Sequence, residues 1–285
     1  IPAAVAGIVG FRPTTGRYPS EGVTPIAPTR DTPGLMAHTV ADVMVADTAV
    51  TGTPHANPPV LAAADIKLGV PRGYFYAGID EEMEPLYEGV LAKLAAAGIE
   101  LVELEVPGLG ELMAASAMPI VLYELSTALR AYVAEYTAEK VTYDELVAGI
   151  ASPDVAGIFE AVAAGGASAE AYQTALAKRE ELRTVYAELY ASSGVDALVF
   201  PTTMLPARPI SCTGATVELN GEAAPTFASY VRNTEPATIA ALPSITLPVG
   251  TVCGGMPVGL ELDGPEGEDA KVLAVSAVVE ALLSQ

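Results

Sequence analysis

The fold is decided by residues 66–106, whose sequence is IKLGVPRGYFYAGIDEEMEPLYEGVLAKLAAAGIELVELEV. The run Ile66–Pro71 is short, apolar and ended by proline, as is typical of a buried strand. Three acidic residues, Asp80–Glu82, then favour a helix N-terminus, and apolar residues follow at helical spacing until Gly98. Residues 99–106 alternate well enough for a second strand. A strand, a helix and a strand within about forty residues form a βαβ unit, which favours a parallel sheet covered by helices.

The rest of the chain fits the same class. A helical pattern runs almost unbroken through residues 111–192, with interruptions at Ser152-Pro153 and Gly165-Gly166, and Ser168 is placed to cap its last helix. We therefore expect an α/β fold with a mixed, largely parallel central sheet, helices on both faces and a helical subregion at 111–192. Further strands are predicted at residues 197–200, 244–249 and 258–262, and further helices at 39–50 and 268–283.

Composition excludes several partners. Asp and Glu outnumber Lys and Arg by 35 to 14, which gives a net charge of −21 and repels phosphate backbones and anionic lipid surfaces. The sequence has no basic run and no window of 18 uninterrupted apolar residues. We expect neither a nucleic acid nor a membrane as a partner, and with 51% hydrophobic residues the chain can bury a substantial core.

A self-contained catalytic constellation is absent from the sequence. The two histidines, His38 and His55, do not stand near a G-x-S-x-G motif, which is missing, and there is no phosphate-binding G-x-x-x-x-G-K-[ST]. Cys212 and Cys253 lie far apart without a neighbouring histidine, so the sequence predicts neither a metal site nor a redox pair. Isolated thiols suit a reducing cytoplasm, which is the expected location. Taken alone, these residues specify no reaction and no cofactor.

The opening stretch carries a resemblance. Ile1–Ala4, Gly7–Thr14, Asp31–Gly34 and Thr39–Asp42 resemble the amidase signature family in sequence and order. Later segments continue the resemblance over essentially the whole chain. The branch of the family containing mandelamide hydrolase and indoleacetamide hydrolase is the most similar. The further matching segments are 196–202, 242–245 and 257–262, and those that indicate the branch are Arg232–Pro236, Gly259–Pro265 and, more weakly, Tyr123-Glu124.

This resemblance implies both a mechanism and a missing part. Members of the family hydrolyse carboxamides through an acyl-enzyme with a Ser-cis-Ser-Lys triad, and the signature that ends in the nucleophilic serine directly precedes the segment matched by Ile1–Ala4. All three triad residues are therefore expected upstream of Ile1, and no catalytic residue is expected within 1–285. The resemblance implies that residues 1–285 are the carboxy-terminal portion of one amidase domain, whose partners are an amide substrate and the missing amino-terminal part. A homodimer is a further family-based expectation.

Four residues are candidates for binding substrate. Arg232 lies in a loop, where it could bind a carbonyl or carboxylate of the substrate or could tie loops together through backbone carbonyls. Thr202 follows a strand end, where ligands of α/β sheets gather, although simple turn chemistry would also explain it. Thr234 and Tyr123 belong to the segments that indicate the branch.

Several functions are compatible with these motifs. The main expectation is hydrolysis of small aryl-acetic-type carboxamides. A pocket of another shape would take anilides, carbamates or ureas with the same mechanism. The amidotransferase A subunit of the same family, which passes ammonia to a partner, and a non-catalytic amidase-like binding scaffold are the remaining alternatives.

Overall fold

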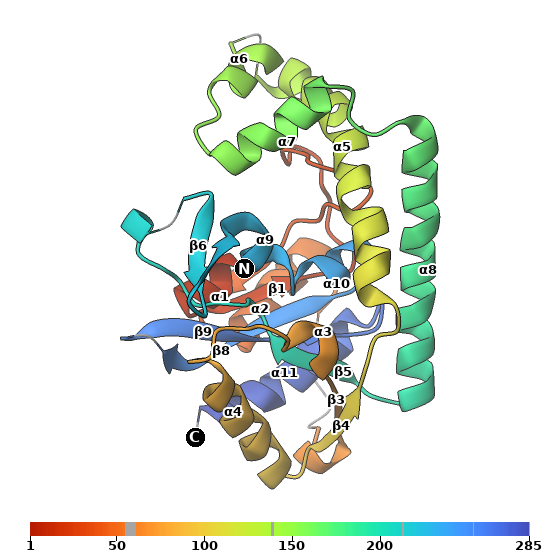
Figure 1. Ribbon diagram of the computed structural model, residues 1–285. Helices are drawn as coiled ribbons and strands as arrows, with labels where there is room; N and C mark the ends of the chain where they lie inside the picture. Colours follow the sequence, from red (N-terminus) through yellow and green to blue (C-terminus); the bar gives the residue numbers. More distant parts are fainter. Residues whose placement is uncertain (55–60, 138–139, 213, 253, 285) are drawn as a thin grey trace.

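The computed structural model describes residues 1–54, 61–137, 140–212, 214–252 and 254–284, and it contains one seven-stranded sheet in the order β2-β1-β8-β9-β5-β3-β4 (Figure 1). Strand β3 pairs in parallel with β4 and with β5, whereas the other four neighbouring pairs are antiparallel. The strands are β1 Val9–Arg12, β2 Leu35–Ala37, β3 Lys67–Pro71, β4 Glu100–Leu104, β5 Ala197–Pro201, β8 Ser244–Val252 and β9 Met256–Asp263.

Connection length explains the two kinds of pairing. Strands β3 and β4 are joined through helix α4 (Glu84–Ala96), a crossover of the length that parallel pairing needs. Strands β8 and β9 follow each other almost directly along the chain and form an antiparallel hairpin with Val252 opposite Met256. The expected mixed α/β class is confirmed, and its parallel pairing is confined to β4, β3 and β5 among the described strands.

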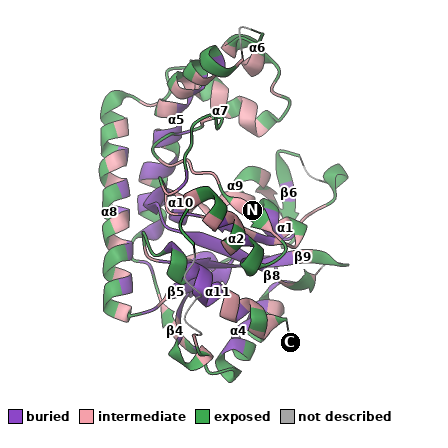
Figure 2. Cartoon of the chain, turned by 180° about the vertical axis from the view of Figure 1, so that it is seen from behind, coloured by how far each residue is buried: buried purple, intermediate pink, exposed green. Residues whose placement is uncertain are grey.

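Helices cover both faces of the sheet. Successive side chains of β5 point to opposite faces, so that Ala197 and Val199 enter one hydrophobic core while Leu198 and Phe200 enter another. Figure 2 shows the buried sheet enclosed between helical layers. The first core is completed by α2 (Val40–Thr51), α4 and α11 (Asp269–Leu283), and the second by α5 (Leu109–Tyr136), α8 (Ala169–Ser193) and α10 (Glu235–Ala240).

The helical pattern predicted at 111–192 forms helices α5, α6 (Tyr143–Ala148), α7 (Pro153–Ala163) and α8. Long helices α5 and α8 pack side by side (Figure 1). Two interruptions fall at Ser152-Pro153 and Gly165-Gly166 as predicted, and the Ser168 hydroxyl accepts the N–H of Ala171 at 3.1 Å as a cap. A further break, between the end of α5 at Tyr136 and the start of α6 at Tyr143, was not predicted; Thr142 and Glu145 form a capping box there. Helix α5 alone among the described helices is long and apolar enough to cross a membrane by length and composition; half of its most apolar window is buried inside the protein, as in a core helix.

Helix α4 begins later than the acidic run Asp80–Glu82 predicts. It starts at Glu84, and Asp80 is buried, forming an ion pair with Arg208 while its Oδ1 atom accepts the N–H of Glu82 at 3.0 Å. The acidic run therefore stabilises the turn before the helix, because a buried carboxylate is held by a cation and a backbone donor more strongly than by a helix terminus. Gly98, with a φ of 101°, ends the helix region as predicted.

Short elements complete the fold. They are α1 (Pro2–Ala6), α3 (Arg72–Phe75), α9 (Thr226–Val231) and the hairpin of β6 (Thr216–Leu219) with β7 (Glu222–Pro225). Helix α1 lies on the sheet at two glycines: a Cβ at Gly10 would stand 2.5 Å from Ala3 Cβ, and one at Gly259 would stand 2.6 Å from Ala4 Cβ. The missing side chains let α1 approach the strands closely, which places Ile1 over the sheet.

Candidate active site

A cavity of about 370 Å³ lies beside Ile1, between α1, α10 and strands β1, β2, β8 and β9. Its volume is within the range of small-molecule sites. One part of the wall is apolar and another carries hydroxyl and charged groups, so the cavity offers both apolar contact and hydrogen bonding. The apolar lining residues include Ile1, Pro2, Phe11, Leu35 and Met36, and the polar ones are Arg12, Thr234, Thr238, Ser244, Thr246 and Glu261.

Strand register assembles the floor of this cavity. Ser244 pairs with Asp263, and Thr246 pairs with Glu261, across the β8–β9 hairpin. Residues two apart in a strand face the same side of a sheet, so these four polar side chains share one face. We call Ser244, Thr246, Glu261 and Asp263 the polar strip. Strand β1 extends the strip on its other side, where Arg12 pairs with Ser244.

The two carboxyl groups of the polar strip are buried without adequate partners. Glu261 is 6% exposed and Asp263 is 1% exposed. No well-aligned hydrogen bond reaches Glu261 Oε2, either carboxylate oxygen of Asp263 or Ser244 Oγ among the described residues, although the hydroxyls of Thr202 and Ser244 act to lower the pKa of Glu261 and of Asp263, respectively. Burial raises the pKa of both carboxyl groups, and the neighbouring Glu261 charge raises the pKa of Asp263 further. The strip therefore favours either protonated carboxyl groups or a positive charge close to them.

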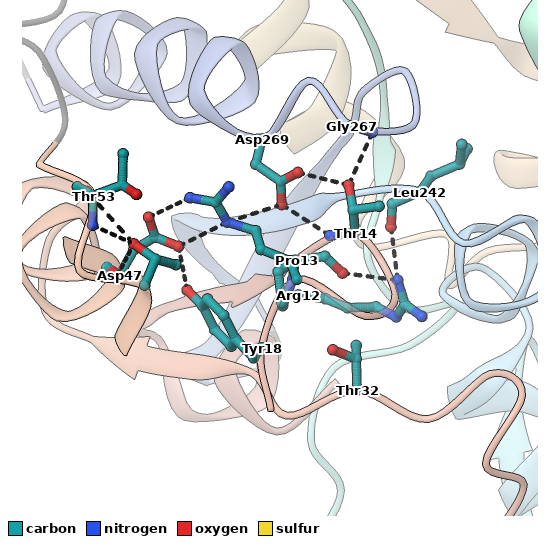
Figure 3. Close-up of polar contacts among 12 residues, drawn as sticks. Arg12, Pro13, Thr14, Tyr18, Thr32, Asp47, Thr53, Leu242, Gly267 and Asp269 are labelled. Carbon is teal, nitrogen blue, oxygen red and sulfur yellow. Dashed lines mark hydrogen bonds and ion pairs between the residues drawn. The ribbon is translucent and has the colours of Figure 1, made fainter. Parts of the chain in front are cut away.

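Arg12 closes one end of the cavity and is already engaged. Its guanidinium donates to the backbone oxygen of Leu242 at 2.7 Å and to that of Pro13 at 3.2 Å (Figure 3). It also donates to Thr15 Oγ1 at 2.8 Å and to the backbone oxygen of Arg30 at 3.1 Å. Loss of hydration lowers the pKa of Arg12 to about 10, so the side chain stays cationic at neutral pH. Its hydrogen bonds fix the loops around the cavity.

A second network fixes the opening loop on the far side of Arg12. Asp269, at the start of α11, accepts the backbone N–H of Thr14 at 2.8 Å and the Thr14 hydroxyl at 2.6 Å (Figure 3). Asp47 in α2 accepts the Tyr18 hydroxyl at 2.6 Å and two guanidinium N–H groups of Arg17 at 2.7 and 3.1 Å. Two helices, α2 and α11, therefore hold the loop that follows β1.

Thr234 and Thr202 are the candidate residues that the structure brings to this site. Thr234 lines the cavity directly at the start of α10. Thr202 is fully buried at the end of β5, and its Oγ1 lies 2.6 Å from Oγ1 of Thr246, a residue of the polar strip. Thr202 thus supports the floor, and Thr234 faces the cavity space.

Arg232 makes the contacts expected of its loop-tying alternative. Its guanidinium donates to the backbone oxygens of Ala77 at 2.6 Å and Tyr74 at 2.5 Å. It also lies over the Tyr74 ring, with Cζ 4.6 Å from the ring centroid. Arg232 does not belong to the cavity lining, and its donors are largely occupied by backbone carbonyls. A substrate contact of Arg232 stays a prediction.

Tyr123 lies at a different cavity. Its ring stacks on Tyr172 with centroids 4.1 Å apart, and it is 41% exposed on α5. It lines a separate hollow of about 720 Å³ formed by α5, the Pro28-Thr29 loop and the turn at Gly165-Gly166. The structure does not join Tyr123 to the cavity beside Ile1, and its role in substrate binding stays a prediction.

Sequence reasoning missed the polar strip, although a signal was present. In the strand predicted at residues 258–262, an acidic residue interrupts a run that is otherwise apolar, and another follows it at position 263. Charged residues at alternate positions of a buried strand are costly unless they have partners, which marks such positions as candidates for a site. For metal chemistry, the described part of the chain holds no group of three or more His, Cys, Asp and Glu side chains placed for an ion; His55 and Cys253 lie outside the described residues.

The fold belongs to a defined class of proteins. The Amidase family model matches residues 1–273, and the chain is a member of the amidase family. The resemblance drawn from the opening stretch is therefore confirmed. Among solved structures, one described as the crystal structure of amidase matches with a TM-score of 0.80 and 29% identity over 99% of this chain and 59% of that one. The native peptide amidase from Stenotrophomonas maltophilia matches with a TM-score of 0.72 and 26% identity over 99% of this chain and 60% of that one.

Relatives of known name fall in the expected branch. Indoleacetamide hydrolase of Rhizobium radiobacter is 38% identical over 282 residues, which cover 98% of this chain and 60% of that protein. Mandelamide hydrolase of Pseudomonas putida is 38% identical over 296 residues, covering 100% of this chain and 56% of that protein. The chain thus spans about 60% of the length of the curated relatives that it matches.

Proposed function

We propose that the protein is the substrate-pocket portion of an amide hydrolase for small aryl-acetic-type carboxamides. The observation that carries the proposal is the 38% identity to indoleacetamide hydrolase and mandelamide hydrolase, which extends over the residues that build the cavity beside Ile1. The apolar wall of Ile1, Phe11 and Leu35 suits an aromatic acyl group, whereas the hydroxyls of Thr234 and Thr238 offer hydrogen bonds to an amide.

The proposed chemistry divides the work between two parts of the polypeptide. Residues that precede Ile1 supply the Ser-cis-Ser-Lys triad. The neutral lysine accepts a proton through the middle serine while the nucleophilic serine oxygen attacks the amide carbon. Collapse of the tetrahedral intermediate breaks the C–N bond, the amine leaves with a proton, and water then hydrolyses the serine ester to the free acid. The residues described here orient the acyl group and exclude water from it.

The test is ammonia release by a polypeptide that includes residues preceding Ile1. Indole-3-acetamide and mandelamide are expected to turn over, and a serine-to-alanine change at the nucleophile is expected to abolish turnover. Hydrolysis of anilides, carbamates or ureas without hydrolysis of either aryl-acetic amide would contradict the proposed substrate class. Copurification with an unrelated subunit and activity with glutamine would instead favour an amidotransferase subunit, and no turnover of any amide would favour a binding scaffold.

A further inference from the structure

Two threonine hydroxyls at helix α10 line the cavity beside Ile1 with a fixed hydrogen-bond polarity. The Thr234 hydroxyl donates to the backbone oxygen of Val231 at 3.2 Å, and the Thr238 hydroxyl donates to the backbone oxygen of Thr234 at 3.1 Å. A carbonyl oxygen carries no hydrogen, so the threonine is the donor in both bonds. Each Oγ1 atom keeps its lone pairs for the cavity, and the two side chains therefore present acceptors to a ligand.

The spacing of the two threonines brings these acceptors together. Thr234 directly precedes α10 with helical backbone angles, φ −91° and ψ −15°, and Thr238 lies one turn further along the helix. Residues four apart in a helix lie on the same face, one above the other. A ligand group with two N–H donors can therefore meet both oxygens at once.

Arg12 does not provide a competing set of donors. Among the described residues of the cavity lining it carries the cationic side chain, and all four of its terminal N–H groups are engaged. Their acceptors are the backbone oxygens of Pro13, Leu242 and Arg30 and the hydroxyl of Thr15. The cavity wall formed by α10 and Arg12 thus favours a ligand that brings its own N–H donors.

The end of α10 is held in one conformation. Ala241, which follows the helix, has a φ of 63°, a left-handed conformation that is unfavourable for a residue with a Cβ. Carbonyl groups on both sides of it are fixed by arginines: Arg179 Nε donates to the backbone oxygen of Ile239 at 2.9 Å, and Arg12 donates to that of Leu242 at 2.7 Å. Strained backbone persists where the surrounding contacts over-determine it. The helix that carries the acceptors is therefore preorganised before a ligand binds.

We propose that Thr234 and Thr238 are specificity-determining residues that accept hydrogen bonds from the NH₂ group of a primary carboxamide. The inference rests on the proposed function, because it takes the cavity beside Ile1 as the amide site. Two acceptors match the two N–H donors of the amide nitrogen, while Phe11 and Leu35 contact the aryl group. An ester of the same acid has no N–H, so both threonine oxygens would lose water without gaining a partner.

The experiment measures binding separately from turnover. The protein is a polypeptide that includes residues preceding Ile1 and carries the serine-to-alanine change at the nucleophile. Calorimetry gives the Kd of phenylacetamide and of methyl phenylacetate for this protein and for Thr234→Val, Thr238→Val, Thr238→Ser and the double valine variant. Thr184→Val on α8 is the matched control, because its hydroxyl donates to the backbone oxygen of Glu180 at 2.9 Å in the same way, on an exposed face.

Each valine variant is expected to weaken phenylacetamide binding roughly three- to tenfold, the net effect of one neutral hydrogen bond, and the double variant is expected to weaken it further. The affinity for methyl phenylacetate should stay within about twofold, because the ester makes neither bond. Thr238→Ser keeps the hydroxyl and should retain the preference for the amide, and the control should change neither affinity. Thr234 makes no side-chain cap bond to α10, so its valine variant removes no cap. Thermal unfolding checks that each variant folds, and Thr238→Val decides alone if Thr234→Val does not.

Equal weakening of the amide and the ester would assign the threonines to the structure of α10 and overturn the proposal. Unchanged amide binding in the double variant would overturn it too, and so would binding of neither ligand to the parent protein. Ammonia release from mandelamide by the polypeptide with its serine intact decides the proposed function separately. Turnover with equal losses for both ligands would leave that function standing without this specificity, whereas a selective loss without turnover would support the acceptor face alone.

Discussion

Asp47 and Asp263 are both buried, but the cost of burying their charges is offset to different extents. Asp47 is fully buried but accepts two guanidinium hydrogen bonds from Arg17 and the hydroxyl of Tyr18. Asp263 is equally buried, and among the described residues neither of its carboxylate oxygens has a well-aligned hydrogen bond; the Ser244 hydroxyl and the charge of Arg12 only partly favour its ionised form. The cost of burying the charge is thus offset more fully at Asp47 than at Asp263. The two residues should respond in opposite directions when they are neutralised.

Substitution of Asp47 by alanine is expected to lower the free energy of unfolding by about 3 kcal/mol, because Arg17 and Tyr18 lose the acceptor that they share. The conservative change Tyr18→Phe removes one hydrogen bond to a charged group and should cost about 1.5 kcal/mol. Urea unfolding followed by circular dichroism measures both. Asp144→Ala on the surface of α6 serves as the control, since its side chain is 86% exposed. Equal stability of D47A and D144A would contradict the expectation.

Neutralising Asp263 in the 285-residue chain should flatten the pH dependence of stability. Burial raises the pKa of Asp263 in the folded state, so the folded chain binds more protons than the unfolded chain above the unfolded pKa of about 3.9. The free energy of unfolding therefore falls as the pH rises from that value through the folded pKa. Asp263→Asn removes this group, and its stability should fall less between about pH 4 and pH 7. Parallel pH profiles of the variant and the wild type would show that Asp263 does not titrate in this way.

At the scale of elements, helix α1 depends on the glycines beneath it. Gly10→Ala would bring a Cβ to 2.5 Å from Ala3 Cβ, which can move only with the backbone of α1, and to 3.2 Å from Thr246 Cγ2. Displacement of α1 is expected to lower the free energy of unfolding by about 1–3 kcal/mol. Gly89→Ala, in helix α4 with nothing within 4 Å of the new Cβ, is the control and should stabilise by up to about 1 kcal/mol. If G10A lowered the free energy of unfolding no more than G89A, the position of α1 would not depend on these contacts.

The helices and strands also show which parts of the fold can be predicted from the sequence. Helices α4, α8 and α11 and strands β3, β5, β8 and β9 were predictable, because each carries a local period or a clear boundary such as Ser168 or Gly98. Strand β2 has three residues and helix α1 has five, too few for a period, and their existence depends on contacts with distant segments. The burial of Asp80 against Arg208 has the same origin, since 128 residues separate the partners.

The candidate site was less accessible to prediction than the fold. Thr234 was found because its segment resembles the family, and its position on the cavity wall depends on α10 packing beside the sheet. The polar strip joins residues of β8 and β9 whose pairing is fixed by the hairpin register, and a one-residue shift would have faced them to the other side. That register cannot be predicted from the sequence before the hairpin is known.

For the whole molecule, the apolar wall of the cavity decides how the chain behaves with and without the preceding residues. Met36, on the edge strand β2, is 62% exposed and lines the cavity beside Ile1 and the half-buried Leu35. We expect residues that precede Ile1 to cover Met36 at this edge of the sheet and to leave the inner wall of Phe11 and Leu35 open to substrate. The 285-residue chain and a longer polypeptide should therefore differ in exposed apolar surface as well as in activity.

Dye binding tests this difference. The 285-residue chain is expected to enhance the fluorescence of anilinonaphthalene sulfonate more than the longer polypeptide does, because the dye binds exposed apolar surface. Met36→Gln should lower the signal of the short chain and leave the longer one nearly unchanged, since the preceding segment already covers that position. Ile210→Gln, at a residue that is 92% exposed and outside the cavity lining, is the matched control and should act equally in both chains. If Met36→Gln also acted equally in both chains, the wall would be open in each, and the preceding segment would have to dock on another face of the sheet.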